Sequence, residues 1–219
     1  MIMKAIYFRM FLFLLVIFSL GSCDNQNKTL INDAIISSYI IEYRTTVEQG
    51  NLKSLSHMTQ WVDNENKLYA VLTITETDIA GRKLSGKSLM INKKGWSYVL
   101  NLDERSGFKS KTNQDESLIS SYLKPSETAK LKEMVEEDNG RIVGEELILG
   151  RSCQVVEMPE MDESGRKTLT KIWYYRGIPL KIITQLSVME AIIFEENITI
   201  PSEKFEVPEG IEVKTIPSL

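Results

Sequence analysis

The chain has 219 residues, of which 26 are lysine or arginine and 30 are aspartate or glutamate, with one histidine and two cysteines. A single histidine excludes a multi-histidine metal centre, and two cysteines this far apart exclude a zinc ribbon or a disulfide framework. The net charge of −4 argues against a nucleic-acid-binding surface, which needs clustered basic residues. Because the sequence holds no catalytic motif, we expect no enzymatic activity, no metal and no cofactor, and infer function from targeting signals and fold.

Residues 1–22 are typical of a secretory signal peptide. Lys4 and Arg9 precede the apolar run 10–18, and small residues follow it. A helix that spans a bilayer needs about 20 predominantly apolar residues. This stretch approaches that length only by including both basic residues, so a permanent anchor helix is the less favoured alternative.

The signal ends in Leu20-Gly21-Ser22-Cys23, which resembles the lipobox of bacterial lipoproteins. The resemblance implies that diacylglycerol alkylates the Cys23 thiol and that Cys23 becomes the mature N-terminus. Residues 23–28 then form the lipidated N-terminus and a short polar tether, and residues 29–219 form one domain. The alternative is a chance cysteine beside an ordinary cleavage site. We expect a monomer in the bacterial cell envelope, attached to a membrane through acylated Cys23 and facing the periplasm or the cell surface.

Most of the remaining sequence predicts β-strands. In the first, Ser37 to Glu48, the apolar residues Tyr39, Ile41 and Tyr43 alternate with mostly polar ones. Glycine and asparagine pairs between the strands predict tight turns, which join antiparallel neighbours. The other predicted strands are 53–62, 67–76, 87–92, 95–102, 141–149, 152–158, 167–175, 180–186 and 189–200.

Helix signals occur in two places. Residues 30–35 have the i, i+4 spacing of a short helix, and residues 115–138 carry two apolar faces divided by Pro125. Ser126 is the predicted N-cap of the second piece, and Asn139-Gly140 ends it. The sequence therefore predicts a mainly β (α+β) fold with a large, curved antiparallel sheet.

Several residues could suggest chemistry, but each has a simpler interpretation. His57 is interpreted as an ordinary strand histidine, and Cys153 as a small buried core residue. Neighbouring carboxylates such as Glu145 and Glu146 point to opposite faces of a strand and do not converge on one ligand. The aromatic runs 96–98 and 172–175 are interpreted as core, with the lining of an apolar cavity as the alternative.

Residues 144–157, 171–181 and 200–210, together with 88–109, are similar to outer-membrane lipoprotein-sorting proteins of the LolA and LolB type. The resemblance implies an incomplete antiparallel barrel, with helices packed on its open side and a cavity for acyl chains between them. Arg44 resembles a basic residue that some members place near this cavity. A lipidated chain is closer in design to the anchored LolB type.

We therefore expect a lipid-anchored protein that binds a lipid or an acylated protein in an apolar cavity, with lipoprotein sorting as one role. An envelope scaffold with a closed core is the first alternative, and a hydrolase without a recognisable motif is the second. Strand parity predicts these cavity-lining residues: Tyr39, Ile41, Tyr43, Leu72, Ile74, Leu89, Ile91, Trp96, Tyr98, Ile172, Tyr174 and Ile182.

Overall fold

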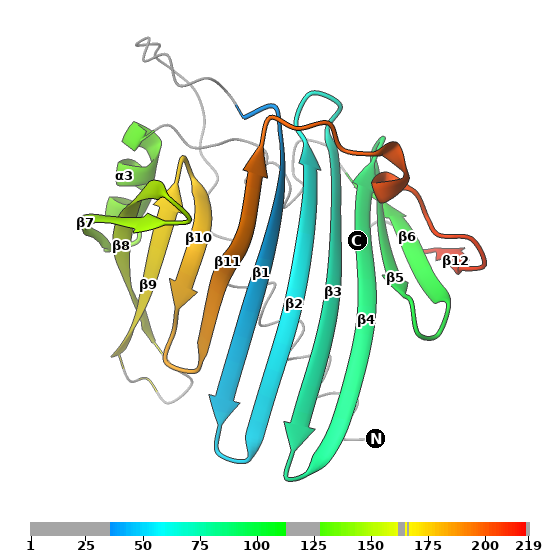
Figure 1. The fold of residues 1–219 in the computed structure, drawn as a ribbon, viewed down its shortest axis with the longest axis horizontal. Helices are drawn as coiled ribbons and strands as arrows, with labels where there is room; N and C mark the ends of the chain where they lie inside the picture. Colours follow the sequence, from blue (N-terminus) through cyan, green and yellow to red (C-terminus); the bar gives the residue numbers. More distant parts are fainter. Residues whose placement is uncertain (1–35, 113–127, 162–164, 166, 218–219) are drawn as a thin grey trace.

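The computed structural model describes residues 36–112, 128–161, 165 and 167–217, which form one curved β-sheet (Figure 1). The strands are β1 (Ser38–Gln49), β2 (Leu52–Asp63), β3 (Leu68–Ile79), β4 (Arg82–Lys93), β5 (Trp96–Asn101), β6 (Ser106–Lys111), β7 (Arg141–Ile148), β8 (Arg151–Met161), β9 (Lys167–Tyr175), β10 (Ile178–Ile183), β11 (Ser187–Glu196) and β12 (Glu212–Thr215). Within the described ranges there is one α-helix, α3 (Thr128–Glu137), and one 3-10 helix, η1 (Ser202–Phe205).

The strand order is β12-β6-β5-β4-β3-β2-β1-β11-β10-β9-β8-β7. Neighbours pair antiparallel except β12 and β6, which are parallel. Strand β1 lies inside the sheet, where Tyr39 opposes Val62 of β2 and Glu196 of β11. The described strands form a linear order with two edges, so the sheet is open.

Tight turns join the hairpins, as the glycine positions predict. Leu149-Gly150 connects β7 to β8 with φ angles of 50° and 74°, and Arg176-Gly177 connects β9 to β10 with 49° and 80°. Two successive positive φ angles are typical of the type I′ turn, whose twist matches that of the flanking strands. This turn chemistry fixes the antiparallel order.

The mainly β fold and the curved antiparallel sheet are confirmed, with differences in detail. β6 and β12 were not among the predicted strands. The helix over 128–137 is confirmed, and it ends where Asn139 takes a φ of 57° and the Gly140 amide donates to the Val135 carbonyl over 2.7 Å. The predicted helix over 30–35 and residues 115–127 lie outside the described residues. Helices over an open side are not shown; α3 instead lies at the β7 end of the sheet (Figure 1).

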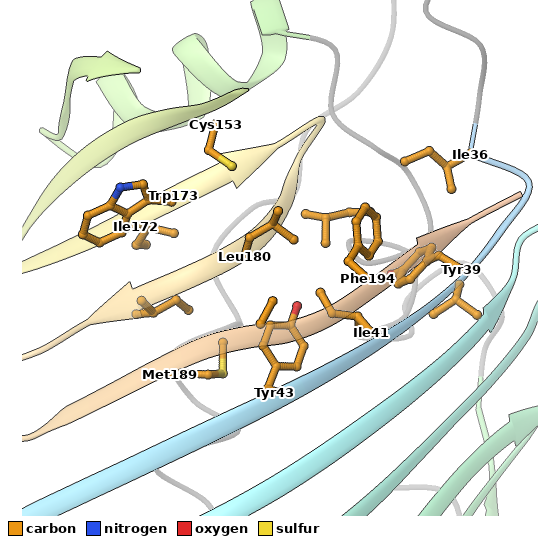
Figure 2. Packing of buried hydrophobic residues seen from close by; sticks show 14 of the residues in the cluster. Ile36, Tyr39, Ile41, Tyr43, Cys153, Ile172, Trp173, Leu180, Met189 and Phe194 are labelled. Atoms are coloured by element: carbon orange, nitrogen blue, oxygen red, sulfur yellow. The ribbon is translucent and has the colours of Figure 1, made fainter. Parts of the chain in front are cut away.

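The sheet has two apolar faces. The first, which we call the tyrosine face, carries a cluster contributed by β1 to β3 and β8 to β11. Figure 2 shows Tyr39, Ile41 and Tyr43 of β1 on the same side as Phe194 and Met189 of β11. On the opposite side of β3 to β5, Ala70, Leu89, Ile91 and Leu100 form a second buried cluster.

The C-terminal segment covers the second cluster, and we call residues 200–211 the strap. Phe205 is 2% exposed and belongs to this cluster, against which Ile200, Val207 and Ile211 also pack. The Glu206 carboxylate accepts a hydrogen bond from the Lys93 ammonium, and the Lys204 Nζ lies 5.4 Å from the centre of the Trp61 ring. We call this side of the sheet the strap face.

Candidate functional site

The tyrosine face contains five of the predicted cavity residues. Tyr39, Ile41, Tyr43, Ile172 and Ile182 are all buried members of its cluster, and Tyr174 packs against it. The Tyr43 hydroxyl donates to the Pro179 carbonyl over 2.8 Å, and the Tyr39 and Phe194 rings meet edge to face at 5.8 Å. Burial raises the pKa of Tyr174 to about 12, and the nearby Asp138 carboxylate adds to the shift. These aromatic side chains are neutral near pH 7, which suits contact with an apolar partner.

The other predicted cavity residues belong to the opposite side. Leu89 and Ile91 are buried in the strap-face cluster, and Leu72 and Tyr98 pack against it. Trp96 opposes Lys93 and is half-buried, and Ile74 is 39% exposed. The structure therefore divides the twelve residues between two faces instead of bringing them to one surface.

The register explains this division. Tyr39 opposes Val62, and Val62 opposes Tyr69, so odd-numbered residues of β1 and β3 share one face. The even-numbered Leu72 and Ile74 consequently point to the other face. Strand alternation groups residues within one strand, but the relation between the faces of neighbouring strands depends on turn length, and a difference of one residue exchanges the two faces.

Among the hollows in the described part of the chain are two that none of the twelve residues lines. One has a volume of about 460 Å³ and lies where β1, β2 and the start of the strap meet, with Ser38, Asp63, Asn66, Asn197 and Phe205 in its wall. The other, of about 260 Å³, is lined by Lys167, Thr168, Leu169 and Gln185. Both have substantially polar walls, which do not suit an apolar ligand.

The residues with simple interpretations lie as expected. Cys153 is fully buried in the tyrosine-face cluster, and burial raises the pKa of its thiol, which disfavours the reactive thiolate. His57 is exposed on β2.

Arg44, which the resemblance places near the cavity, lies elsewhere. It forms a salt bridge with Glu190 and by strand alternation points away from Tyr43, so it lies on the opposite side from the tyrosine face. Cys23 and the predicted signal and tether lie outside the described residues.

The sheet edge at β7 is a surface that the sequence analysis did not identify. Strand β7 pairs with β8 alone among the described strands, and every residue from Arg141 to Leu147 is exposed. Its large apolar residues include Val143, which is 43% exposed, and Leu147, which is 73% exposed. An exposed edge strand offers unpaired backbone donors and acceptors to another chain. The available signal was a strand bounded by turns at both ends that carries the large apolar residues Val143 and Leu147.

Polar and aromatic side chains form a cluster between β7 and the neighbouring strands. The Trp173 indole N–H donates to the Glu146 carboxylate over 2.8 Å, and this hydrogen bond lowers the pKa of Glu146. The Nζ atoms of Lys171 and Lys181 lie 4.9 and 5.3 Å from the centre of the Trp173 ring. The Glu145 carboxylate accepts instead from the Ser152 hydroxyl. The two carboxylates thus bind different partners, as predicted for strand neighbours.

No protein-family model and no curated protein matches this chain. Solved structures with a related chain path include an uncharacterised conserved protein from Thermus thermophilus, with 8% identity, a TM-score of 0.48, and coverage of 83% of this chain and 92% of that one. The Pseudomonas aeruginosa MucA/MucB complex has 14% identity, a TM-score of 0.44, and coverage of 82% and 58%. A putative outer-membrane lipoprotein-sorting protein domain from Vibrio parahaemolyticus has 12% identity, a TM-score of 0.30, and coverage of 79% and 91%.

These neighbours include the class of protein that the sequence resembles, at low identity. Within the described residues, no helix has the length and apolar character needed to cross a membrane.

Proposed function

We propose that this chain is a non-enzymatic, lipid-anchored protein of the bacterial cell envelope that binds a lipid or an acylated protein on its tyrosine face. One observation carries this proposal. The strap-face cluster is packed against Phe205 of the strap, whereas the buried tyrosine-face cluster brings together aromatic and aliphatic side chains from β1 to β3 and β8 to β11 and includes no residue of the strap. The lipobox at Cys23 and the resemblance to lipoprotein-sorting proteins add support from the sequence.

Hydrophobic transfer is sufficient for such binding. Burial of a 16-carbon acyl chain supplies roughly 12 kcal/mol of gross transfer free energy, at about 0.8 kcal/mol per CH₂. Ordering of the ligand and of side chains offsets much of this gain. The Tyr39, Tyr43 and Phe194 side chains are 2%, 2% and 5% exposed, so an acyl chain would insert among them instead of lying on an exposed surface. The Tyr43 hydroxyl already has a backbone partner at Pro179. A bound acyl chain would therefore leave no additional polar group unsatisfied at Tyr43.

The test uses residues 24–219, a segment that contains every described strand and helix. Native mass spectrometry before and after organic extraction shows whether lipid accompanies the purified protein. A stoichiometric lipid is the expected result and identifies the ligand class. A ligand-free mass, with no uptake of a fluorescent fatty acid, would contradict the proposal.

A matched pair of substitutions locates the binding face. Met58 is half-buried against the tyrosine-face cluster, and Leu72 is half-buried against the strap-face cluster. Met58→Trp fills space on the first face and should weaken fatty-acid uptake about tenfold, equal to a loss of about 1.4 kcal/mol. Leu72→Trp makes a similar change on the second face and should leave uptake unchanged. Equal effects would show that the substitutions act through the fold and not through the site.

The exposed β7 edge favours a second candidate function, that of an envelope interaction protein. Such a protein would add an extended strand of a partner to β7, with main-chain hydrogen bonds for affinity and contacts to Val143 and Leu147 for specificity. A photo-crosslinking residue at position 147 should then capture a partner in cells, while the same residue at position 83 should not. A synthetic peptide from the captured segment should bind the wild-type protein and fail to bind Leu147→Lys. Equal capture at both positions would reject this function.

A further inference from the structure

The end of the sheet at which the described chain begins also carries a group of lysines and aromatic rings. There, Ser38 opposes Asp63, and farther along the same end Lys93 opposes Trp96. The Trp96 residue in turn opposes Lys111. Five strand spacings separate β1 from β6, a distance of about 24 Å. The start of β1 and this group therefore lie on the same end of the sheet (Figure 1).

The lysines gather around one aromatic ring. The Lys109 Nζ lies 4.9 Å and the Lys111 Nζ 5.8 Å from the centre of the Trp96 ring. Lys94 is exposed at the tip of the β4–β5 turn, where it takes a φ of 50°. No described carboxylate forms a salt bridge with Lys94, Lys109 or Lys111, in contrast to Lys93, which binds Glu206. The Lys94 ammonium also acts on the Glu206 carboxylate at longer range and is offset in part, whereas Lys109 and Lys111 have no salt bridge with a described carboxylate.

Exposed apolar side chains lie at the same corner. Phe108 of β6 is 42% exposed, and Ile216, which follows β12, is 37% exposed. The two are held close together because Lys214 opposes Phe108 and the Ile216 amide donates to the Lys109 carbonyl over 2.9 Å. Phe108 opposes Val99, whereas Lys109 opposes Tyr98 on the strap face, so Phe108 points to the face opposite to Lys109. We call Lys94, Trp96, Phe108, Lys109, Lys111 and Ile216 the lysine corner.

This combination matches the chemistry of an anionic membrane surface. Tryptophan prefers the boundary between headgroups and acyl chains, and lysines near the surface are attracted to anionic lipids. Phe108 and Ile216 supply apolar side chains that can enter the boundary, a feature that binding of free phosphate or a nucleic-acid backbone does not require. The charge is local, because the chain as a whole is acidic. Trp96 and the lysines flank this end of the sheet on the strap face and Phe108 flanks it on the other face, so a membrane that meets the end edge-on can contact both.

We propose that the lysine corner docks this protein onto the anionic phospholipid headgroups of the membrane to which it is anchored. Its placement in the cell rests on the proposed lipid anchor at Cys23, but the docking itself depends only on described residues. Docking at this end would hold the sheet upright on the membrane, with the turns between β1 and β2 and between β3 and β4 directed away from it. The tyrosine face would then extend from the membrane surface into the aqueous phase.

Vesicle flotation with residues 24–219 tests the docking without the anchor. The expected result is a bound fraction about tenfold greater with phosphatidylcholine vesicles that contain about 30% phosphatidylglycerol than with phosphatidylcholine alone. Binding should fall steeply with added salt. The triple variant Lys94→Gln, Lys109→Gln, Lys111→Gln should lose this preference. A control with the same charge change elsewhere, Lys53→Gln, Lys83→Gln, Lys132→Gln, should retain it.

A second readout places Trp96 at the membrane. Brominated phosphatidylcholine mixed into the anionic vesicles should quench tryptophan fluorescence of the wild type and of Trp61→Phe, whereas Trp96→Phe should lose most of the quenching. Thermal unfolding of each variant confirms that the fold is retained. Lack of preference for anionic vesicles, equal losses in both triple variants, or tighter binding to a single-stranded oligonucleotide would overturn the proposal. None of these outcomes depends on whether lipid occupies the tyrosine face, which native mass spectrometry reports separately.

Discussion

The two edges of the sheet are built in different ways. At one edge, β12 has four residues, pairs parallel with β6, and presents the exposed charged side chains of Glu212 and Lys214. At the other edge, β7 has eight residues and exposes Val143 and Leu147. Short, charged edge strands resist the addition of another strand, whereas long apolar ones invite it. The difference indicates that the β12 edge is closed for stability and that the β7 edge is left open for contact.

The β7 edge also has protective features, among them the exposed charges of Arg141, Glu145 and Glu146 and a bulge. A bulge between Ile142 and Gly144 breaks the regular pairing with β8 near the start of the strand. Bulges twist an edge and locally end its pairing. The regular stretch from Gly144 to Ile148 is therefore where a partner strand would add, and Leu147 lies within it.

The largest expected effect concerns the strap beside the β12 edge. Phe205→Ala removes a side chain that is 2% exposed and should lower the free energy of unfolding by about 3–5 kcal/mol. Phe108→Ala, at a residue that is 42% exposed, should cost much less. Urea unfolding of both variants measures the difference. Similar losses would show that the strap adds little to the closed edge.

A glycine in β6 provides the next test. A Cβ atom on Gly107 would lie 2.6 Å from the Val99 carbonyl oxygen and 2.6 Å from the Leu100 Cδ2 atom. Gly107→Ala should therefore force β5 and β6 apart and cost about 1–3 kcal/mol. Gly86 in β4 has open space around its Cβ position, so Gly86→Ala should be neutral or stabilise by up to about 1 kcal/mol. Thermal unfolding of the two variants compares their stabilities. A Gly107→Ala protein as stable as the wild type would refute tight packing between β5 and β6.

Adding a charge to the β7 edge, or removing one from the β12 edge, should change the rate of aggregation with little effect on the free energy of unfolding. Leu147→Lys places a charge on an exposed edge residue and should alter the free energy of unfolding by no more than about 0.5 kcal/mol. It should nevertheless slow aggregation of the heated protein, while Lys214→Leu should accelerate it. Light scattering at a fixed temperature follows both rates. If Leu147→Lys aggregates as fast as the wild type, strand addition at β7 is not the route.

The smallest effect is pH-dependent. The Lys93 ammonium lowers the pKa of Glu206 near the β12 edge, and the Trp173 indole lowers the pKa of Glu146 near the β7 edge. A carboxylate with a lowered pKa stabilises the fold above its ordinary value of 4.5, and this contribution is lost as the pH falls through the folded-state pKa. Glu206→Gln and Glu146→Gln should therefore melt slightly below the wild type at pH 7.

The difference in melting temperature between each of these variants and the wild type should vanish in acid. Both carboxylates are exposed enough for salt to screen these interactions, so the shifts in melting temperature at pH 7 should be small and should shrink further in high salt. Melting curves of the two variants and the wild type at pH 7 and at a pH well below 4.5 check the sign. A gap that widens in acid would contradict the assignment of Lys93 and Trp173 as the stabilising partners.

Much of the fold could be predicted from local sequence, because turn residues and strand alternation act over short distances. The strand predicted from Ser37 to Glu48 corresponds to β1, and the glycine of Arg176-Gly177 marks an observed hairpin turn. Strand β6, with the sequence Ser-Gly-Phe-Lys-Ser-Lys, has only one large apolar residue and exists because β5 and β12 pair with it. Strand β12 is likewise formed by a long-range pairing that no local pattern encodes.

The candidate site was predictable only in part. The structure places Tyr39, Ile41 and Tyr43, which share one strand, in one buried cluster. Their relation to Leu72 and Ile74 depends on the length of each intervening turn, and a one-residue difference exchanges the faces. The lysine corner was not predictable from spacing, because Lys94, Trp96 and Lys111 meet only through the β4–β5–β6 register.

The pairing of β1 with β11 has a consequence for how the protein folds. Consecutive hairpins join β1 to β6 and β7 to β11, and these contacts are local in sequence. The ladder from Tyr39 opposite Glu196 to Val47 opposite Ser187 instead joins distant parts of the chain. Formation of non-local pairs costs loop-closure entropy before any contact is gained, and it slows folding. We expect the two hairpin arrays to form early and independently, and their union along β1 and β11 to limit the rate at which the tyrosine face is assembled.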